Sequence, residues 1–478
     1  MKKIILNFAL AVVLSSCESE GVIYENAYVI EDINLIDPID GIAENMSVVV
    51  SGNKIIETFK TKEVKLSSKN EIYVGSGKFL LPGLWDTHIH FSYERDLSSA
   101  MPNLFLAHGI TSVRDTGGEF DFVNKFKEES IEQPKIKSRV KIAGPLIDGK
   151  FNVYDGSSPT FPLLSIQNND LEQLEKNALY LVEKKVDFLK AYEMLSHEQF
   201  KLLAGIAKKH NLKLTGHVPL SMNVIDASNM GLNSIEHLRN IELSMTNQSD
   251  ELFEERKNLL KNETNIKGST LRTMLHQKQR MRSIYSLDSS KIKDVVKVLA
   301  KNDTWQITTM RLYKNFALKK YKNLEYFSLL DLLPPTKKEE WINEINLIPP
   351  SLDQQVIEYT EWSSKMVRYM HKNGIKFMAG TDSPIGYLIP GLSLHQELED
   401  LQSSGLSELE TIQTATTNPA EYFNIQDSLG RIKSGFIADL IVLDKNPLDD
   451  ISNTKSIHAV IKDGHYMNRA YLDSLLSN

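Results

Sequence analysis

The stretch that decides the fold is residues 81–90, LPGLWDTHIH, in which His88 and His90 end a short apolar run. Side chains two residues apart on a β-strand point to the same face, so both imidazoles would point toward one spot. A single His-X-His pair also occurs in proteins that bind no metal. The interpretation as a metal site therefore depends on four later residues, each of which closes a short apolar run: Lys190, His217, His237 and Asp382.

Between residues 81 and 427, short β-like runs alternate with amphipathic helical stretches such as 170–185, 197–210 and 352–372. This alternation is typical of βαβ units and a parallel sheet. Strands are expected near residues 85–91, 111–114, 140–143, 187–191, 213–217, 234–238, 305–310 and 376–380. Eight strands predict an α/β fold, a (β/α)8 TIM barrel. The carboxyl ends of its strands meet at one face, where the six candidate ligands would converge.

The two ends of the chain have a different texture. Residues 18–80 and 428–478 contain short alternating runs, such as 46–50 and 439–443, separated by turns. These runs are typical of strands and predict one small β-sandwich domain built from both ends. Residues 245–300, between the sixth and seventh expected strands, are long and highly charged. An insertion at this place would cover the barrel mouth as a lid or a specificity element.

Composition narrows the class of protein. The chain has 478 residues, 41% of them hydrophobic, and a formal net charge of -7. These values are ordinary for a globular enzyme with a small-molecule substrate. Net acidity without a basic stripe argues against a nucleic-acid partner.

Residues 1–17 form a separate segment, in which two lysines and an apolar run precede Cys17, the only cysteine of the sequence. The apolar run is too short for a permanent membrane span, and its end, LSSC, resembles the signal of bacterial lipoproteins. We expect lipid attachment at Cys17, export, and anchoring to a bacterial envelope membrane on its periplasmic or surface side. The alternative is an incidental cysteine at the end of a signal sequence.

The absence of a second cysteine from the sequence means that a metal must be held by nitrogen and oxygen. Neutral imidazoles and a carboxylate suit zinc and similar ions. A lysine ammonium has no lone pair, so Lys190 would bridge metals only after its amine takes up carbon dioxide and becomes a carbamate. The alternative for Lys190 is an ordinary barrel lysine paired with a carboxylate.

The chain resembles the amidohydrolase superfamily, specifically its imidazolonepropionase-like branch, which contains binuclear metal-dependent dipeptidases. The resemblance spans nearly the whole chain after the signal. Its motifs are residues 81–90, 109–118 (GITSVRDTGG), 234–237 (SIEH), 379–383 (AGTDS), 414–420 (TATTNPA) and 435–440 (GFIADL).

The resemblance implies two divalent metal ions, expected to be zinc. The implied ligands are His88, His90 and Asp382 for the first metal, His217 and His237 for the second, and a carbamylated Lys190 as the bridge. A hydroxide bridging the metals would attack a substrate carbonyl. Asp382 would take the proton and return it to the leaving nitrogen.

The sequence departs from the dipeptidase pattern at two places that concern the substrate. Residues 148–150 are Asp-Gly-Lys instead of Gly-Gly-His, and Pro219 stands where a tyrosine is usual. Three residues after other strands are alternative substrate contacts: Tyr192, Arg239 and Arg311. Each has the alternative of being a solvated residue at the barrel rim.

We therefore expect a metal-dependent hydrolase that cleaves an amide bond in a small peptide or an N-acyl compound. The alternatives are a lactone, carbamate or cyclic amide as substrate, or a binding lipoprotein without activity. We expect a structural role for His395. Most of the other histidines are expected at the surface or as helix caps: His108, His197, His210, His276, His371, His458 and His465.

Overall fold

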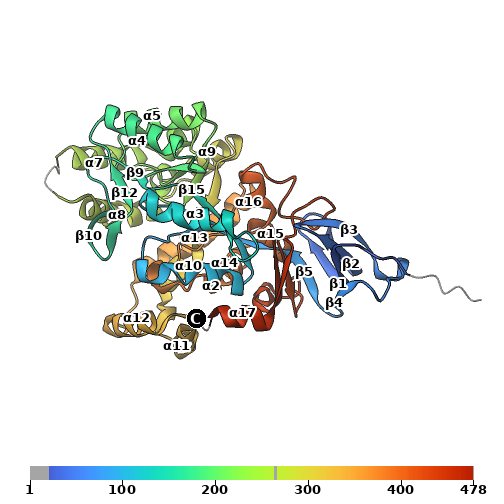
Figure 1. The fold of residues 1–478 in the computed structure, drawn as a ribbon. Coiled ribbons are helices and arrows are strands. Elements are labelled where there is room, and N and C mark those ends of the chain that lie inside the picture. Colours follow the sequence, from blue (N-terminus) through green and yellow to red (C-terminus); the bar gives the residue numbers. More distant parts are fainter. Residues whose placement is uncertain (1–20, 263–265, 477–478) are drawn as a thin grey trace, which may run out of the picture.

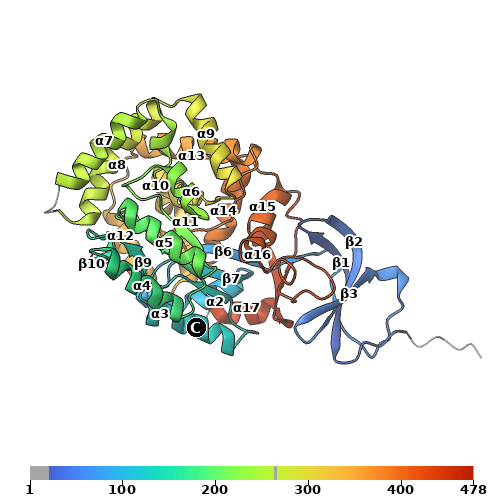
Figure 2. The same cartoon turned by 90° about the horizontal axis from the view of Figure 1, so that it is seen from above.

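The computed structural model describes residues 21–262 and 266–476. In its larger part, short buried parallel strands lie inside and helices lie outside (Figure 1, Figure 2). One parallel sheet consists of β6 (Leu84–Ile89), β7 (Ile110–Asp115) and β8 (Arg139–Ile142). A second has the order β12 (Ser165–Gln167), β9 (Leu146–Asp148), β13 (Phe188–Ala191), β14 (Lys213–Gly216), β15 (Ser234–Glu236) and β16 (Trp305–Ile307).

Residues 376–383 connect the two sheets through backbone hydrogen bonds. The N–H of Gln306 in β16 donates to the carbonyl of Lys376 at 3.0 Å, and the N–H of His90 donates to the carbonyl of Ser383 at 2.9 Å. The sequence predicts a strand here, but the structure shows an extended segment with isolated bridges. The mixed α/β architecture fits a TIM barrel with an extra domain, and closure as eight regular strands stays a prediction.

The helices begin where polar caps follow the strands. Helices α4 (Leu171–Glu183), α5 (His197–Lys209) and α13 (Gln354–Lys372) match the three helical stretches expected from the sequence. The Asp170 side chain accepts from the N–H of Gln173 at the start of α4, and Ser196 forms a capping box with Gln199 at the start of α5. Such caps satisfy backbone donors that have no partner within the helix.

The other helices complete the outer layer. They are α1 (Arg95–Ser98), α2 (Met101–Ala107), α3 (Phe120–Glu132), α6 (Val224–Met230), α10 (Met310–Leu318), α11 (Leu324–Leu329), α12 (Pro335–Leu347), α14 (Leu392–Ser403), α15 (Glu408–Thr414), α16 (Thr417–Tyr422) and α17 (Arg469–Leu476). Among the helices of residues 21–262 and 266–476, we find none that is both long and apolar enough to cross a membrane.

Both ends of the chain contribute to a β domain, which Figure 1 shows at one end of the molecule. Its strands are β1 (Ala27–Asp37), β2 (Gly41–Ser51), β3 (Lys54–Lys60), β4 (Glu71–Val74), β5 (Phe79–Pro82), β17 (Leu440–Leu443), β18 (Ile457–Lys462) and β19 (His465–Asn468). They form one eight-stranded sheet instead of the two sheets of the expected sandwich. The reason is that β5 pairs with β1 on one side and with β17 on the other.

The charged stretch 245–300 forms helices α7 (Ser249–Asn262), α8 (Gly268–Tyr285) and most of α9 (Ser289–Lys301). Helix α9 packs against α6 and leads into β16, so it continues the βα alternation. Helices α7 and α8 are therefore the inserted part, and they pack against each other. A short antiparallel pair, β10 (Asp155–Ser158) and β11 (Phe161–Leu163), projects from the loop after β9.

Candidate metal centre

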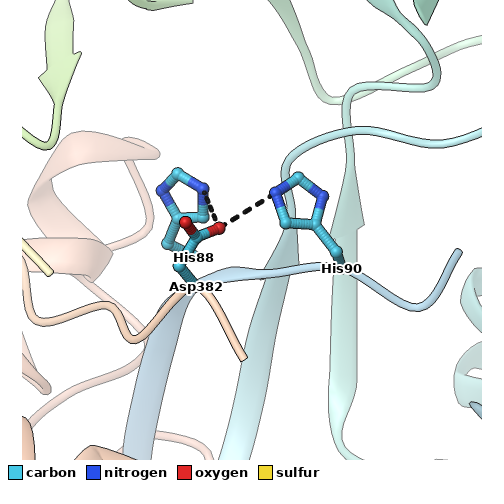
Figure 3. A group of neighbouring side chains, drawn as sticks. All are labelled: His88, His90 and Asp382. Atoms are coloured by element: carbon cyan, nitrogen blue, oxygen red, sulfur yellow. Dashed lines mark ion pairs between the residues drawn. The ribbon is translucent and has the colours of Figure 1, made fainter. Parts of the chain in front are cut away.

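The structure brings the six candidate ligands together at the carboxyl ends of the strands. Asp382 Oδ1 lies 3.1 Å from Nε2 of His88 and 3.1 Å from Nε2 of His90 (Figure 3). Asp382 Oδ2 lies 3.7 Å from Nε2 of His237, and Lys190 Nζ lies 3.4 Å from Nε2 of His88. The imidazole of His217 is next to that of His237, with ring centroids 5.0 Å apart.

The four imidazoles share one orientation, with Nδ1 bonded to the protein. The Nδ1–H groups of His88, His90 and His217 donate to the Glu236 carboxylate at 2.6 Å, the Gly117 carbonyl at 3.0 Å and the Glu193 carboxylate at 2.8 Å, respectively. His237 Nδ1 lies 2.7 Å from the Thr309 hydroxyl. This arrangement turns Nε2 of each ring toward the centre, as in histidines whose second ring nitrogen is fixed by an outer partner. Nε2 of His90 also lies 3.3 Å from the Thr116 hydroxyl.

The Glu236 carboxylate holds the imidazole of His88 in place. This carboxylate accepts from Arg114 Nη2 at 2.8 Å, from the Thr215 hydroxyl and from His88. Burial alone would raise the pKa of Glu236, but Arg114 and His88 hold it well below its usual range. Glu236 is therefore ionised and fixes the tautomer of His88.

The Glu193 carboxylate holds the imidazole of His217 in place, and it also contacts the inserted helix α8. Its other oxygen lies 3.1 Å from Nε2 of His276 on α8. Burial, the largest cause, lowers the pKa of His217 to about 3, against the opposing effect of Glu193. His217 is thus a neutral imidazole at physiological pH.

Backbone geometry places Asp382 and His237. Both residues have left-handed backbone conformations, with φ of 68° and 61°. The N–H of Asp382 donates to the His88 carbonyl at 2.7 Å, and the buried Asp86 carboxylate accepts from the Thr381 hydroxyl at 2.7 Å. Non-glycine residues in this conformation require a surrounding structure that holds them there, and they concentrate at functional sites.

The residues fit a metal of the zinc type. The ligand atoms of His88, His90 and Asp382 all lie within 4.8 Å of one another, and the three residues are buried. Within the described part of the chain, His217 Nε2 and Asp382 Oδ1 are buried and have no hydrogen-bond partner. Neutral nitrogens and a carboxylate oxygen without other partners are the donors that such ions take.

Lys190 projects from β13 into the same group of side chains and is 1% exposed. Burial, the largest cause, lowers the pKa of Lys190 to about 8, while Glu236 and Asp382 oppose this effect. The polar atom that its Nζ contacts is Nε2 of His88 rather than a carboxylate oxygen.

A cavity of about 230 Å³ opens onto this centre. Lys190, His217, His237 and Asp382 line its base. Two of the residues expected to contact substrate, Tyr192 and Arg239, also line it, but the third, Arg311, lies elsewhere. The guanidinium Nε of Arg311 lies 3.0 Å from Asp400 Oδ2, and Arg311 lines a different pocket.

Other residues that line the cavity were not predicted from the sequence. They come from the loop after β6, from the segment just before β10, from β11 and from α8: Tyr93, Tyr154, Phe161 and Arg272. Asp148, which stands at the departure from the dipeptidase pattern, does not line the cavity. Its carboxylate accepts from the N–H groups of Gly149, Val153 and Met194 and so shapes the loop.

The outcome for the remaining histidines is mixed. His108 is the C-cap of α2, and buried His395 bonds to the His108 carbonyl at 2.9 Å and to Thr454 at 3.0 Å, which fits a structural role. The expectation of a surface or capping role for His276 is wrong, because α8 buries it beside Glu193. A single histidine inside a charged helical stretch gives no sequence signal for this contact.

Comparisons with known proteins agree with this architecture. A model described as the amidohydrolase family matches residues 354–467, which include Asp382. Adenine deaminase from Clostridium perfringens is 24% identical over 36% of this chain, and the match covers 30% of that relative's length.

Two solved structures show the same fold over almost the whole chain. A Xaa-Pro dipeptidase with bound methionine has a TM-score of 0.65 and 19% identity, covering 92% of this chain and 100% of that one. The bottromycin amidohydrolase has a TM-score of 0.68 and 17% identity, covering 95% and 91%, respectively. At these identities the likeness concerns the fold alone.

Proposed function

We propose that this protein is a metal-dependent hydrolase of the amidohydrolase superfamily. On a (β/α)8 barrel, it cleaves an amide bond in a small peptide or an N-acyl compound. One observation carries the proposal: four imidazoles present Nε2 to the same buried space, beside the carboxylate of Asp382. Among the described residues, Nε2 of His217 is buried without a hydrogen-bond partner, which a cluster that only stabilised the fold would not require.

Two divalent ions fit this donor set. His88, His90 and Asp382 would hold one ion, and His217 and His237 would hold the other. When bound, such ions polarise a carbonyl oxygen and lower the pKa of water. Lys190 fits the bridging role as a carbamate, which forms when its uncharged amine bonds to the carbon of carbon dioxide and releases one proton. Zinc is the ion that imidazole and carboxylate donors favour.

We assign proton transfer in the proposed reaction to Asp382. Its Oδ2 atom lies 3.7 Å from Nε2 of His237 and lines the cavity, so it is within reach of a water and of a substrate amide. Asp382 accepts the proton of the attacking water and returns it to the leaving nitrogen. Glu236 and Glu193 hold the imidazoles in place meanwhile, which keeps the donor geometry constant during the reaction.

The size of the cavity supports a small substrate. A volume of about 230 Å³ lies below the range of roughly 300–1,000 Å³ that is usual for drug-sized ligands. The Xaa-Pro dipeptidase of similar fold holds a bound methionine, which is a molecule of this small size. A lactone, a carbamate or a cyclic amide of similar size is the alternative for the bond that is cleaved.

The test combines metal analysis with a substrate panel. Protein purified without chelator is analysed for metal, treated with chelator, and reloaded with zinc or manganese. The panel contains dipeptides, N-acyl amino acids, lactones, carbamates and cyclic amides. We expect close to two ions per chain and amide hydrolysis that is lost with the metal and restored by reloading. Metal-loaded protein that hydrolyses nothing in the panel would instead favour a binding lipoprotein.

For localisation, we propose a lipid anchor at Cys17 that holds the enzyme on a bacterial envelope membrane. The support is the sequence of residues 1–17, which lies outside the described residues. The membrane would be contacted through the acyl chains alone.

A further inference from the structure

Two arginines from different parts of the fold line one side of the cavity. Arg239 follows the β15 strand end and lies two positions after His237, whereas Arg272 lies on α8 of the insertion. Arg272 is held firmly, because its guanidinium carbon lies 5.9 Å from the ring centroid of Tyr154 and 5.6 Å from that of Phe161. Its Nη1 atom also lies 3.4 Å from the hydroxyl of Tyr192.

The protein leaves this pair of cations incompletely neutralised. The carboxylate that both guanidiniums approach is that of Glu193, at 3.9 Å from Arg239 Nε and 3.7 Å from Arg272 Nη1. Both distances exceed a hydrogen bond. The same carboxylate already accepts from His217 and contacts His276. Two guanidiniums thus share one carboxylate that is occupied elsewhere.

Unused donors mark the same place. Among residues 21–262 and 266–476, the Nε atoms of Arg239 and Arg272 are buried and have no hydrogen-bond partner. A buried donor without a partner costs free energy, and a guanidinium is suited to bind a carboxylate through two parallel hydrogen bonds. Together with the long distances to Glu193, these unpaired donors show that neither guanidinium has a close anionic partner in the protein.

Apolar side chains also line the cavity. They include Phe161, which lies beside Arg272, together with Tyr93, Leu312 and Phe316. Aromatic and aliphatic side chains of this kind bind an apolar group of similar size through buried area. The cavity thus combines two arginines, apolar side chains and the donor cluster of the metal centre.

We propose that Arg239 and Arg272 bind a free carboxylate of the substrate, so that the substrate is a dipeptide or an N-acyl amino acid with an apolar side chain. This inference rests on the proposed function for the bond that is cleaved. The carboxylate contacts the two arginines, the apolar side chain packs against lining residues such as Leu312 and Phe316, and the adjacent amide faces Asp382. Helix α8 is in this way a specificity element, because it supplies one of the two cations.

The first experiment measures binding alone, so that it does not depend on turnover. The probes are N-methanesulfonyl-L-phenylalanine, whose sulfonamide bond resists hydrolysis, and its primary carboxamide, which lacks the charge. Calorimetry on the metal-loaded wild-type protein should show the carboxylate binding about tenfold or more tighter, as expected for charged hydrogen bonds. Equal affinity for the two probes would overturn the proposal whether or not the protein is a hydrolase.

Variants then separate the arginines from the metal as the anion site. Arg272→Met and Arg239→Met should each reduce the carboxylate preference strongly, and Arg272→Lys should retain part of it. The control is Arg282→Met on the same helix, because Arg282 is 41% exposed and pairs with Glu255 on α7. An unchanged preference in Arg272→Met, with metal content equal to that of the wild type, would show that the carboxylate binds the metal instead and would reject the subsite.

Discussion

The Glu193 carboxylate lies 2.8 Å from Nδ1 of His217, and its second oxygen lies 3.1 Å from His276 of the inserted helix α8. This one buried side chain connects a candidate metal ligand to helix α8, whose Arg272 lines the cavity. The orientation of His217 Nε2 therefore depends on the charge and the position of Glu193. The insertion is thus linked to the metal centre by a specific contact between Glu193 and His276.

Glu193→Gln tests this relationship. The amide keeps an oxygen that can accept from His217 but loses the charge that faces His217 and His276. We expect metal affinity to fall about 10–100-fold, the usual cost of losing an outer partner of a histidine ligand. Titration with a competing chelator measures it. The matched control is Glu198→Gln, since Glu198 pairs with exposed His197. Equal affinities in the two variants would contradict the role of Glu193.

Lys190→Ala tests the bridge. If the carbamate of Lys190 joins the two ions, its loss should remove most of the bound metal and most of the activity. A small carboxylate such as acetate or propionate in the assay should restore part of both, because it can occupy the vacated place. Lys208→Ala, at an exposed position of α5, is the control. Full metal content in Lys190→Ala would mean that Lys190 is an ordinary barrel lysine.

The positions of the strand ends could be predicted from the sequence because each is a short apolar run closed by a polar residue. His88 and His90 at the end of β6, and Asp382 after the extended segment, illustrate this rule. The segment itself is less regular than predicted, since local composition does not reveal left-handed residues such as Asp382. The pairing of β5 with β17 could not be predicted from the local sequence either, because tertiary packing determines which strands pair when they are far apart in the sequence.

The arginine side of the cavity was only half predictable. Arg239 follows a strand end and so could be named, whereas Arg272 lies inside a charged helix that looks solvated in the sequence. Arg272 lines the cavity because of the way α8 packs in the folded protein, which the sequence of this helix does not reveal. Arg311 illustrates the opposite case, since it lies close to a strand end but pairs with Asp400. The position of a residue after a predicted strand indicates that it lies near the carboxyl ends of the strands, but it does not indicate which way its side chain points.

Cys17→Ser tests the lipid anchor. The wild-type protein, expressed with its full sequence in a bacterial host, should partition into the detergent phase, and the variant should move to the aqueous phase because acylation requires the thiol. Ser16→Ala serves as a control, since it keeps the cysteine. If the Cys17→Ser protein still enters the detergent phase, lipidation at this residue is wrong.

The contact between Asp37 and Arg431 should make stability depend on pH. The Asp37 carboxylate accepts from Arg431 Nη2 at 2.8 Å and from the Ile432 N–H at 3.1 Å, which joins the end of β1 to the C-terminal segment. Burial alone would raise the pKa of Asp37, but Arg431 and backbone N–H groups lower it below its usual value of 3.8. The stabilising contribution is therefore complete above the unfolded pKa and is lost as pH falls through the folded pKa.

Asp37→Asn should accordingly lower the free energy of unfolding at neutral pH by about 1–3 kcal/mol, as for hydrogen bonds to a charged group. The difference from the wild type should shrink as the pH falls below the usual aspartate pKa of 3.8. Urea unfolding of metal-free protein at several pH values measures both. Asp40→Asn is the control, because Asp40 contacts the same arginine but is 65% exposed, and its effect should be smaller. A difference that grows on acidification would contradict the expected direction of this pH dependence.

Asp382→Asn separates metal binding from proton transfer. The amide oxygen of the variant can still face the imidazoles of His88 and His90, which lie 3.1 Å from the native carboxylate, but it cannot accept a proton. We expect metal content to remain largely intact while kcat falls by a factor on the order of 10²–10⁴, the usual contribution of a general acid or base. Metal analysis and steady-state kinetics on the same preparation decide between the two functions. Asp400→Asn is a matched control, since Asp400 is a buried carboxylate that pairs with Arg311 outside the cavity. Near-normal turnover in Asp382→Asn would require another base, and the mechanism would have to be abandoned.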